Sequence, residues 1–574
     1  MKIAQRLPVR TVHLLILGVI ALPYFTNLGG SSLWDANEAF YAETPREMIA
    51  SGDYIAPTFN FQPRPQKPPL TYWAIALAYK IFGVREFSVR LPGALAAVGV
   101  ILFTYGIALN LAGRRQALLA AVIAGTTGRV FIVARRLPID VLLLFFLLAT
   151  AYFIVRGLKT KSRGNWALAY IFAAFGFLTK GPIAWLVPGA SYLVWSIWTR
   201  RFRLAGVHAW MGAAIVVAIV APWYLLVYDA HGWTYIAPFF LRDNIARFAS
   251  EDFGPSRGIF YYVTAYLGDF FPWSLFTPLA VYALWKNRNA PATGAGEPDV
   301  REPAPPSAHL GLGFPLVWCA FVFLFFSLSR NKQEYYIGSV YPMMAVLIGS
   351  AVSALAGSGS RSIAKVHGWT CSITAVALLA FAIVLPLVAQ SIFPGLPDVL
   401  RLAPSFILFV TFTALAWNIV RGQHAQCFGT LAMAIWGLFA CFAAFYLPAV
   451  ERFRPVRDLC GLIDLYAAPG DEAGYFRATT PSMVYYLRRP IFEEYDAEAM
   501  ARRFRSPGRV LCLMTKRDYD KLLEYRDLKL SVLDRRARLV TQLRVLLNPE
   551  EAGDQDLLLV SDDPKPGQQG RIIQ

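Results

Sequence analysis

The chain is a series of long apolar segments separated by shorter polar stretches. About 20 apolar residues are enough for a helix to cross the hydrocarbon core of a bilayer. Thirteen candidate spans cover residues 11–29, 89–112, 116–134, 138–156, 165–179, 182–199, 208–228, 262–285, 312–329, 335–356, 369–390, 404–421 and 427–447. The pattern predicts an α-helical polytopic membrane protein whose first span is retained, because it is longer than a signal-peptide core and no A-x-A site follows it.

Basic residues between the spans predict the orientation. If the N-terminus is cytoplasmic, the inner segments include 157–164 and 200–203, which are rich in Lys and Arg and contain no acids. This arrangement follows the positive-inside rule. An odd number of spans then places the C-terminus outside the cytoplasm.

The same topology divides the chain into a membrane domain, residues 1–450, and a soluble outer domain, residues 451–574. Long outer loops cover 30–88 and 229–261, and such loops are typically functional. The inner segment 286–311 is rich in Pro, Ala and Gly and is typical of a linker. The last domain is predicted to be a small α/β unit. Its expected strands are 472–477, 490–495, 509–514 and 557–560, and its expected helices are 481–487, 497–504 and 516–525.

Composition excludes several classes of protein. The chain is 56% hydrophobic and carries a net charge of +18, but no basic stripe with interleaved aromatic residues predicts nucleic-acid binding. Neither the six Cys nor the six His residues show metal-ligand spacing, so no metal ligand is assigned, although a divalent metal requirement stays open. No Walker, G-x-S-x-G or H-E-x-x-H motif occurs, which favours a lipid-borne over a nucleotide-borne substrate.

The first outer loop holds the densest group of candidate residues. A carboxylate there can act as a general base, and a lysine between prolines can bind a phosphate leaving group. Composition alone favours a plainer interpretation, a solvated amphipathic helix over Asn37–Ala50. The candidates are Asp35, Asn37, Glu38, Tyr41, Glu43 and Lys67.

Asp140 is the second candidate, at the start of a strongly apolar segment and directly after Arg135 and Arg136. An acid at the edge of a span is costly unless it meets water or a partner, so intramembrane acids are functional candidates. The alternative is a structural ion pair at the interface.

A third group consists of basic residues on the predicted outer side, where positive charge is disfavoured. They are Lys180, Arg242, Arg247, Arg330 and Lys332, the last two close to Tyr336. Each of them alone is explained by a long side chain that extends its charged end to the interface between membrane and water. Together with the acids they predict a site for a lipid phosphate or pyrophosphate.

Several motifs in a fixed order carry a resemblance. They are Tyr41-Ala42-Glu43 with Arg46-Glu47-Met48, Lys67-Pro68-Pro69, Leu178-Thr179-Lys180-Gly181-Pro182, Pro222-Trp223-Tyr224, Arg247-Phe248, Pro272-Trp273 and the stretch from Ser327 to Pro342. In these motifs the chain resembles the GT-C membrane glycosyltransferases, in particular the bacterial lipid A aminoarabinose transferases and the dolichyl-phosphate-mannose protein mannosyltransferase superfamily.

The resemblance implies inverting transfer of a pentose or hexose from a polyprenyl phosphate to lipid A, another envelope glycan or a protein, at the periplasmic face of the bacterial inner membrane. It assigns donor phosphate contacts to Lys67, Arg247 and Tyr336, with Arg330 and Lys332 as further candidates, and substrate contacts to Tyr41, Glu43 and Lys180. Asp140 matches the second acid of the family.

Three positions depart from the family pattern. Asn37 replaces an Asp, Phe40 replaces a frequent Arg, and Gln66 replaces the acid before Lys-Pro-Pro. Because Asn cannot accept a proton as a carboxylate does, the base in this loop is left between Asp35 and Glu38. An acceptor that is already anionic needs no strong base, and Asn37 then orients it.

Two other functions compete with the enzyme. A transporter is the first, but the internal repeats frequent in transporters are not visible here. A non-catalytic binder of a lipid-linked sugar is the second, and Asn37 keeps it open.

The predicted topology is testable by cysteine labelling in intact cells. A Lys516→Cys variant is expected to react with a membrane-impermeant maleimide from outside, because residues 451–574 lie outside the cytoplasm. A Ser162→Cys variant, in the inner segment 157–164, is the matched control and is expected to react only after permeabilisation. The reverse pattern would overturn the orientation.

Overall fold

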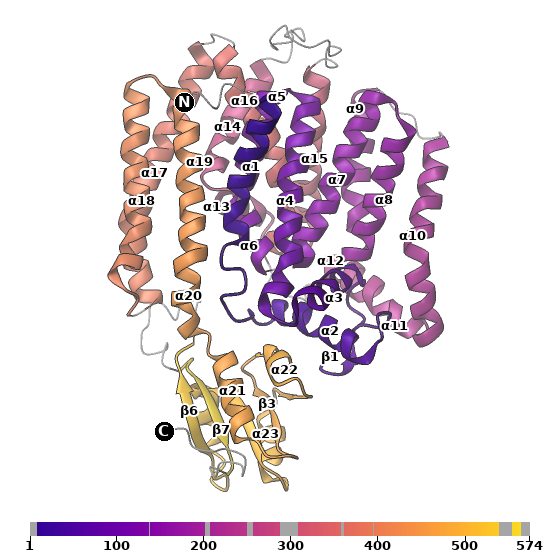
Figure 1. Cartoon of the computed structure of the whole chain (residues 1–574), viewed down its shortest axis with the longest axis vertical. Helices are drawn as coiled ribbons and strands as arrows, with labels where there is room; N and C mark the ends of the chain where they lie inside the picture. The colour runs from indigo at the N-terminus through magenta and orange to yellow at the C-terminus, as the bar shows by residue number, and fades with distance from the viewer. Residues whose placement is uncertain are drawn as a thin grey trace.

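The computed structural model describes residues 8–136, 138–200, 207–249, 257–286, 308–357, 361–393, 395–538 and 554–563. A bundle of roughly parallel helices forms the larger part, and a small sheet domain lies at one end of it (Figure 1). The same end carries α2 (Asn37–Ser51), α3 (Leu70–Phe82), α11 (Trp233–Ala237) and α12 (Arg247–Ala249). The two predicted outer loops and the C-terminal domain therefore share one end of the bundle, opposite the N-terminus.

Each of the thirteen predicted spans coincides with one helix or with adjoining helical pieces. The helices are α1 (Val9–Phe25), α4 (Glu86–Leu111), α5 (Arg114–Gly125), α6 (Gly128–Arg136), α7 (Pro138–Thr160), α8 (Arg163–Lys180), α9 (Ile183–Trp198), α10 (Val207–His231), α13 (Tyr261–Asp269), η3 (Trp273–Phe276), α14 (Thr277–Lys286), α15 (Ala308–Leu328), α16 (Val340–Gly357), α17 (Arg361–Ile392), α18 (Asp398–Val420), α19 (His424–Cys441), η5 (Phe442–Tyr446) and α20 (Leu447–Val450). The predicted linker 286–311 falls largely outside the described residues.

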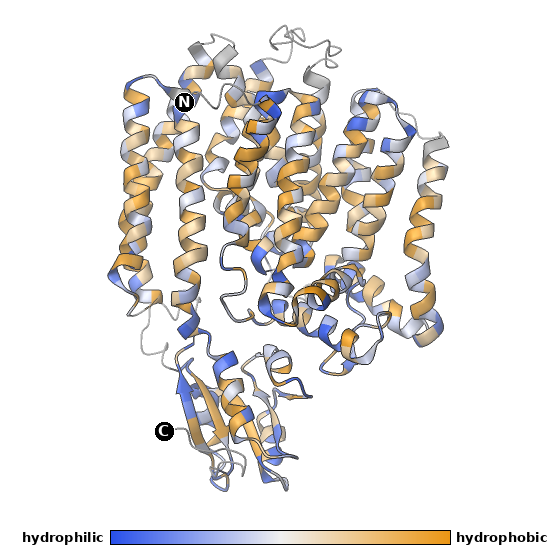
Figure 2. Ribbon diagram, viewed as in Figure 1, coloured by the Kyte–Doolittle hydropathy of each residue, from blue (hydrophilic) through white to orange (hydrophobic). Residues whose placement is uncertain are grey.

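Seven of these segments are long and apolar enough to cross a membrane, or eight if α5 and α6, which meet at a bend of 55°, form one broken span. Apolar residues predominate in the middle of the bundle, and polar residues are more frequent towards its two ends (Figure 2). The protein is therefore a multi-pass membrane protein. The count of thirteen spans stays a prediction.

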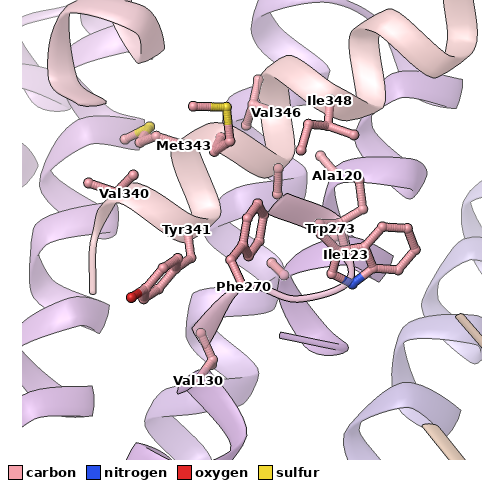
Figure 3. Close-up of a cluster of buried hydrophobic side chains, with 14 of the residues drawn as sticks. Ala120, Ile123, Val130, Phe270, Trp273, Val340, Tyr341, Met343, Val346 and Ile348 are labelled. Carbon is pink, nitrogen blue, oxygen red and sulfur yellow. The ribbon is translucent and has the colours of Figure 1, made fainter. Parts of the chain in front are cut away.

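The centre of the bundle is packed around Trp273 and its neighbours from α5, α6, α13 and α16 (Figure 3). The indole is fully buried and donates to Thr126 Oγ1 over 3.1 Å. Close approach of α16 to α5 requires Gly349, since a Cβ there would lie 2.8 Å from the backbone nitrogen of Ala120. The apolar segments thus pack at close range, as small residues allow between membrane helices.

The first outer loop is built on a buried ion pair. Arg90 of α4 donates to both carboxylate oxygens of Glu38, over 2.6 and 3.0 Å, and to the carbonyl oxygens of Leu28, Ser31 and Ser32. Its side chain is 3% exposed, and that of Glu38 is fully buried. One guanidinium therefore fixes both the chain that leaves α1 and the first turn of α2.

The helix predicted over 37–50 is present, but the solvated interpretation of it is wrong. Glu38, Glu43 and Glu47 are all buried. Glu47 accepts from Thr58 Oγ1 and the Phe61 amide, and so ties α2 to the hairpin of β1 (Thr58–Phe59) and β2 (Gln62–Pro63). The sequence pattern of this helix does not show that Glu38 and Glu47 find their partners in other segments, at Arg90 and at residues 58–61.

The C-terminal domain contains a five-stranded sheet in the order β4-β3-β5-β7-β6. The three strands β4 (Phe492–Glu494), β3 (Glu472–Phe476) and β5 (Val510–Thr515) are parallel, whereas β7 (Leu557–Ser561) is antiparallel to β5 and to β6 (Ser531–Arg536). The helices are α21 (Val456–Tyr466), α22 (Ser482–Leu487), α23 (Ala497–Arg505) and α24 (Lys516–Leu522). The prediction of an α/β unit is confirmed. The structure also contains α21 and β6, which the sequence pattern did not predict.

Polar contacts join this domain to the first outer loop. Asp35 accepts from the amide and the hydroxyl of Ser482, over 2.8 and 2.9 Å. Asn60 exchanges two hydrogen bonds with the backbone of Ile491. Trp34 lies beneath the guanidinium of Arg454, 3.9 Å from its ring centroid. The loop is thus held between the membrane helices and the C-terminal domain.

Removing one partner of the buried pair is expected to weaken the fold. Glu38→Ala would leave Arg90 charged and buried without its carboxylate, which costs roughly 3–5 kcal/mol in comparable pairs. We expect a lower apparent melting temperature in detergent and faster proteolysis within residues 30–88. The matched control is Glu498→Ala, which breaks an ion pair whose side chains are 68% and 64% exposed and is expected to cost less than about 1 kcal/mol. Equal stability of the two variants would contradict this role.

Candidate active site

A cavity of about 990 Å³ lies where the first outer loop meets the helix bundle. Its wall is assembled from α2, the segment 64–67, α6, α7, the turn between α8 and α9, the π-helical segment η2 (Pro238–Ala246) with α12, and the end of α15 with η4 (Glu334–Ile337). Two predicted outer loops thus contribute to one space. π-helical turns such as η2 are frequent at functional sites.

Three side chains form a bridged cluster at the polar end of this cavity. Asp243 of η2 accepts from Lys67 Nζ with Oδ2 and from Arg247 with Oδ1, each over 3.2 Å. Lys67 also donates to the carbonyl oxygen of Gln66, over 2.8 Å. Pro68 and Pro69 follow Lys67 and restrict the backbone before α3 begins. Two cations from different loops are therefore held side by side.

A second ion pair, Lys180 with Asp140, stands in the same space. Asp140 lies in the first turn of α7, where the helix dipole stabilises a negative charge. Lys180 is the last residue of α8, because Gly181 turns the chain at φ 84°, and a Cβ there would collide with the ring of Phe239. The ammonium of Lys180 lies 4.8 Å from the ring centroid of Tyr335 and 5.7 Å from that of Tyr336.

The other part of the cavity is apolar. It runs along α7 from Asp140 to Leu147, a distance of roughly 10 Å at 1.5 Å per residue. The side chains along it are Leu143, Leu144, Leu147, Ile183, Leu186, Val187, Phe325 and Phe326. A single space therefore offers a charged chamber that continues into an apolar channel.

The structure brings most predicted residues into this cavity. Those that line it are Asn37, Tyr41, Lys67, Asp140, Lys180, Arg242, Arg247 and Tyr336. Asp140 does not pair with the neighbouring arginines: Arg135 donates to carbonyl oxygens at the end of α1, and Arg136 lies over the Trp34 ring. Asp140 does form an ion pair, and its partner is Lys180 at the end of α8.

Five predicted residues have other surroundings. Asp35 and Glu38 hold Ser482 and Arg90, as described above. Glu43 binds Arg46 of its own helix, with contacts of 2.5 and 2.7 Å. Lys332 is buried and donates to the carbonyl oxygen of Ser329, and the side chain of Arg330 is exposed. None of the five is among the described residues that line the cavity.

Asp243, Arg64 and Gln66 also line the cavity, although the sequence assigns none of them to the site. Asp243 lies four residues before Arg247, and this spacing is typical of an ion pair within a helix. Arg64 lies 3.9 Å above the centroid of the Phe40 ring, so a cation stands beside the position where the family often has Arg. Gln66 has a buried side-chain oxygen without a hydrogen-bond partner in the described structure, available to a ligand hydroxyl or amine.

Burial changes the acidity of the loop residues. Desolvation lowers the pKa of Lys67 to about 8, and the nearby charges of Arg247 and Lys180 act in the same direction while Asp243 opposes them. Desolvation raises the pKa of Glu43 to about 7, although Arg46 opposes the shift. Lys67 is therefore a cation near neutral pH that an anionic ligand would stabilise further.

Among the described residues, no group of three or more His, Cys, Asp or Glu side chains is arranged to hold a metal ion. The charges of the cavity are provided by the ion pairs and arginines described above.

The chain is similar in sequence to several known proteins. Residues 66–226 match the family described as dolichyl-phosphate-mannose-protein mannosyltransferase. The undecaprenyl phosphate-α-4-amino-4-deoxy-L-arabinose arabinosyl transferase of Erwinia tasmaniensis is 29% identical over 422 residues, 70% of this chain and 71% of that protein. An uncharacterised protein of Aquifex aeolicus is 27% identical over 447 residues, which cover 78% of this chain and 80% of that protein.

Among solved structures, ArnT from Cupriavidus metallidurans bound to undecaprenyl phosphate aligns with a TM-score of 0.74 over 97% of this chain and 99% of that chain, at 21% identity. This likeness establishes the fold. Together the matches confirm the predicted resemblance to the GT-C membrane glycosyltransferases and to the lipid A aminoarabinose transferases.

The lowered pKa of Lys67 predicts how binding of an anion depends on pH. Above pH 8 the folded protein loses this proton, so affinity for a phosphate monoester is expected to fall by roughly tenfold between pH 7 and 9. Farnesyl phosphate is a suitable probe, since a phosphate monoester with a second pKa near about 6 does not titrate in this range. Titration calorimetry measures the affinity.

Lys67→Arg keeps the cation charged throughout this range and is expected to remove the pH dependence. Lys80→Arg, at an exposed position on α3, is the matched control and is expected to retain it. A flat profile for the unmodified protein would exclude Lys67 as the group responsible.

Proposed function

We propose that the chain is an inverting glycosyltransferase that moves a pentose or hexose from a polyprenyl phosphate to an acceptor of the cell envelope. One observation carries the proposal, the continuity of a cationic chamber with an apolar channel in a single cavity. A polyprenyl phosphate has the same two parts, an anionic head and a hydrocarbon chain. The named activity of the relatives, arabinosyl transfer from undecaprenyl phosphate, is of this class.

The donor phosphate is assigned to Lys67, Arg247 and Tyr336. When the bond from the anomeric carbon to the phosphate oxygen breaks, its electron pair stays on the phosphate, whose negative charge grows. Cations fixed next to that oxygen stabilise the transition state more than the ground state. The prenyl chain would lie along Leu143, Leu147 and Leu186, which are apolar and line the channel.

Asp140 is proposed as the group that receives or orients the acceptor proton. Its side chain is 8% exposed and lines the cavity. The new bond forms between the acceptor oxygen and the anomeric carbon, from the face opposite the leaving phosphate. Asn37 lines the same space and would orient the acceptor by hydrogen bonding.

The first-loop acids Asp35 and Glu38 are proposed as structural residues, because their carboxylates are engaged by Ser482 and Arg90. In this proposal neither of these two acids is the catalytic base, and Asp140 takes that role.

The site is proposed to work at the periplasmic face of the inner membrane, with the N-terminus in the cytoplasm and the C-terminal domain outside. The acceptors that fit the proposal are lipid A, another envelope glycan or a protein hydroxyl.

Asp140→Asn tests the chemistry. Loss of the carboxylate is expected to reduce turnover by roughly 100-fold or more, the usual contribution of a general base, while affinity for farnesyl phosphate is retained or rises. Turnover is measured with radiolabelled polyprenyl-phosphate sugars and membrane acceptors, by extraction of the labelled product.

Asp458→Asn is the matched control, since that side chain is 64% exposed in the C-terminal domain. The variants Asp35→Asn and Glu38→Gln are expected to lower stability rather than the rate of correctly folded enzyme. A fully active Asp140→Asn protein would defeat the assignment.

A further inference from the structure

Asp243 stands between the two cations assigned to the donor phosphate. Its Oδ2 lies 3.2 Å from Lys67 Nζ and its Oδ1 lies 3.2 Å from Arg247 Nη2, so both oxygens are engaged. The side chain is 6% exposed and lines the cavity. A phosphate that binds Lys67 and Arg247 therefore meets this carboxylate as a competitor.

The cations have other contacts that hold them in place. Lys67 donates to the carbonyl oxygen of Gln66, and Arg247 interacts with the hydroxyl of Tyr336. Asp243 is therefore one of several groups that contact these two side chains. Its distinctive property is a negative charge in contact with both.

The charge of the ligand changes during the proposed reaction. A polyprenyl-phosphate sugar is a phosphodiester with one negative charge. The polyprenyl phosphate that remains is a monoester with a charge of about −1.5 to −2 near pH 7. Coulombic repulsion grows in proportion to the charge of the ligand, so a fixed carboxylate weakens binding of the product more than binding of the donor.

We propose that Asp243 determines the selectivity of this site between phosphodiester and phosphomonoester, and so promotes release of the spent lipid carrier. The inference rests on the proposed function. As the sugar leaves, the phosphate gains charge and is repelled by Asp243, which recovers full contact with Lys67 and Arg247 when the carrier departs. No proton or covalent bond is exchanged with Asp243.

The test compares binding of two probes, farnesyl phosphate and its methyl ester, which differ by about one charge at neutral pH. Asp243→Asn is expected to tighten binding of the methyl ester by roughly threefold and of farnesyl phosphate by roughly tenfold, because the Coulombic free energy scales with ligand charge. Calorimetry at constant ionic strength measures both. In turnover, the same variant is expected to show stronger product inhibition and a lower KM together with a lower kcat.

Three further variants complete the test. Asp243→Ser removes the same charge with a smaller side chain, which covers the case in which Asp243→Asn does not fold. Asp243→Glu keeps the charge and is expected to retain the selectivity of the unmodified protein. Asp229→Asn removes an exposed acid at the end of α10 and is expected to change neither affinity.

An unchanged ratio of the two affinities in Asp243→Asn and Asp243→Ser would overturn the inference and leave the proposed function intact. The same holds if Asp243→Glu behaves like Asp243→Asn. If the unmodified protein binds neither probe, the proposed function itself fails, and the inference fails with it.

Discussion

The buried ion pair between Arg90 and Glu38 is the interaction on which the arrangement of the site depends. A desolvated guanidinium is costly unless its donors are satisfied, and here a carboxylate and the carbonyl oxygens of residues 28, 31 and 32 satisfy them. Because Glu38 opens the first turn of α2, the same contact sets where Asn37 and Tyr41 meet the cavity. Without this anchor, the first turn of α2 would lose its ion pair with α4.

One cavity contains both a charged part and an apolar part. In its charged chamber Lys180 lies next to Asp140, and Lys67 and Arg247 lie next to Asp243. Its apolar channel needs no such compensation. The chamber is thus already organised before a ligand arrives, and an incoming phosphate exchanges partners with existing groups rather than bringing uncompensated charge into the membrane region.

The sequence predicts the helical segments well because apolar runs of span length have few alternative structures. It also singles out Asp140, Lys67 and Arg247, since each stands out chemically from its surroundings, and all three line the cavity. It does not separate Asp35 and Glu38 from a catalytic acid, because their partners, Ser482 and Arg90, come from 447 and 52 residues away. The sequence does not single out Asp243 for a related reason, because Lys67, to which its carboxylate binds, is 176 residues away.

The contacts of Asp35 with Ser482 and of Asn60 with Ile491 have a consequence for biosynthesis. The first outer loop is synthesised early, whereas the segment that completes it is made more than 400 residues later. A ribosome that stops before that segment therefore releases a chain whose helices can insert but whose loop lacks its partners. Only polypeptides translated at least as far as Ile491 can therefore form both of these contacts.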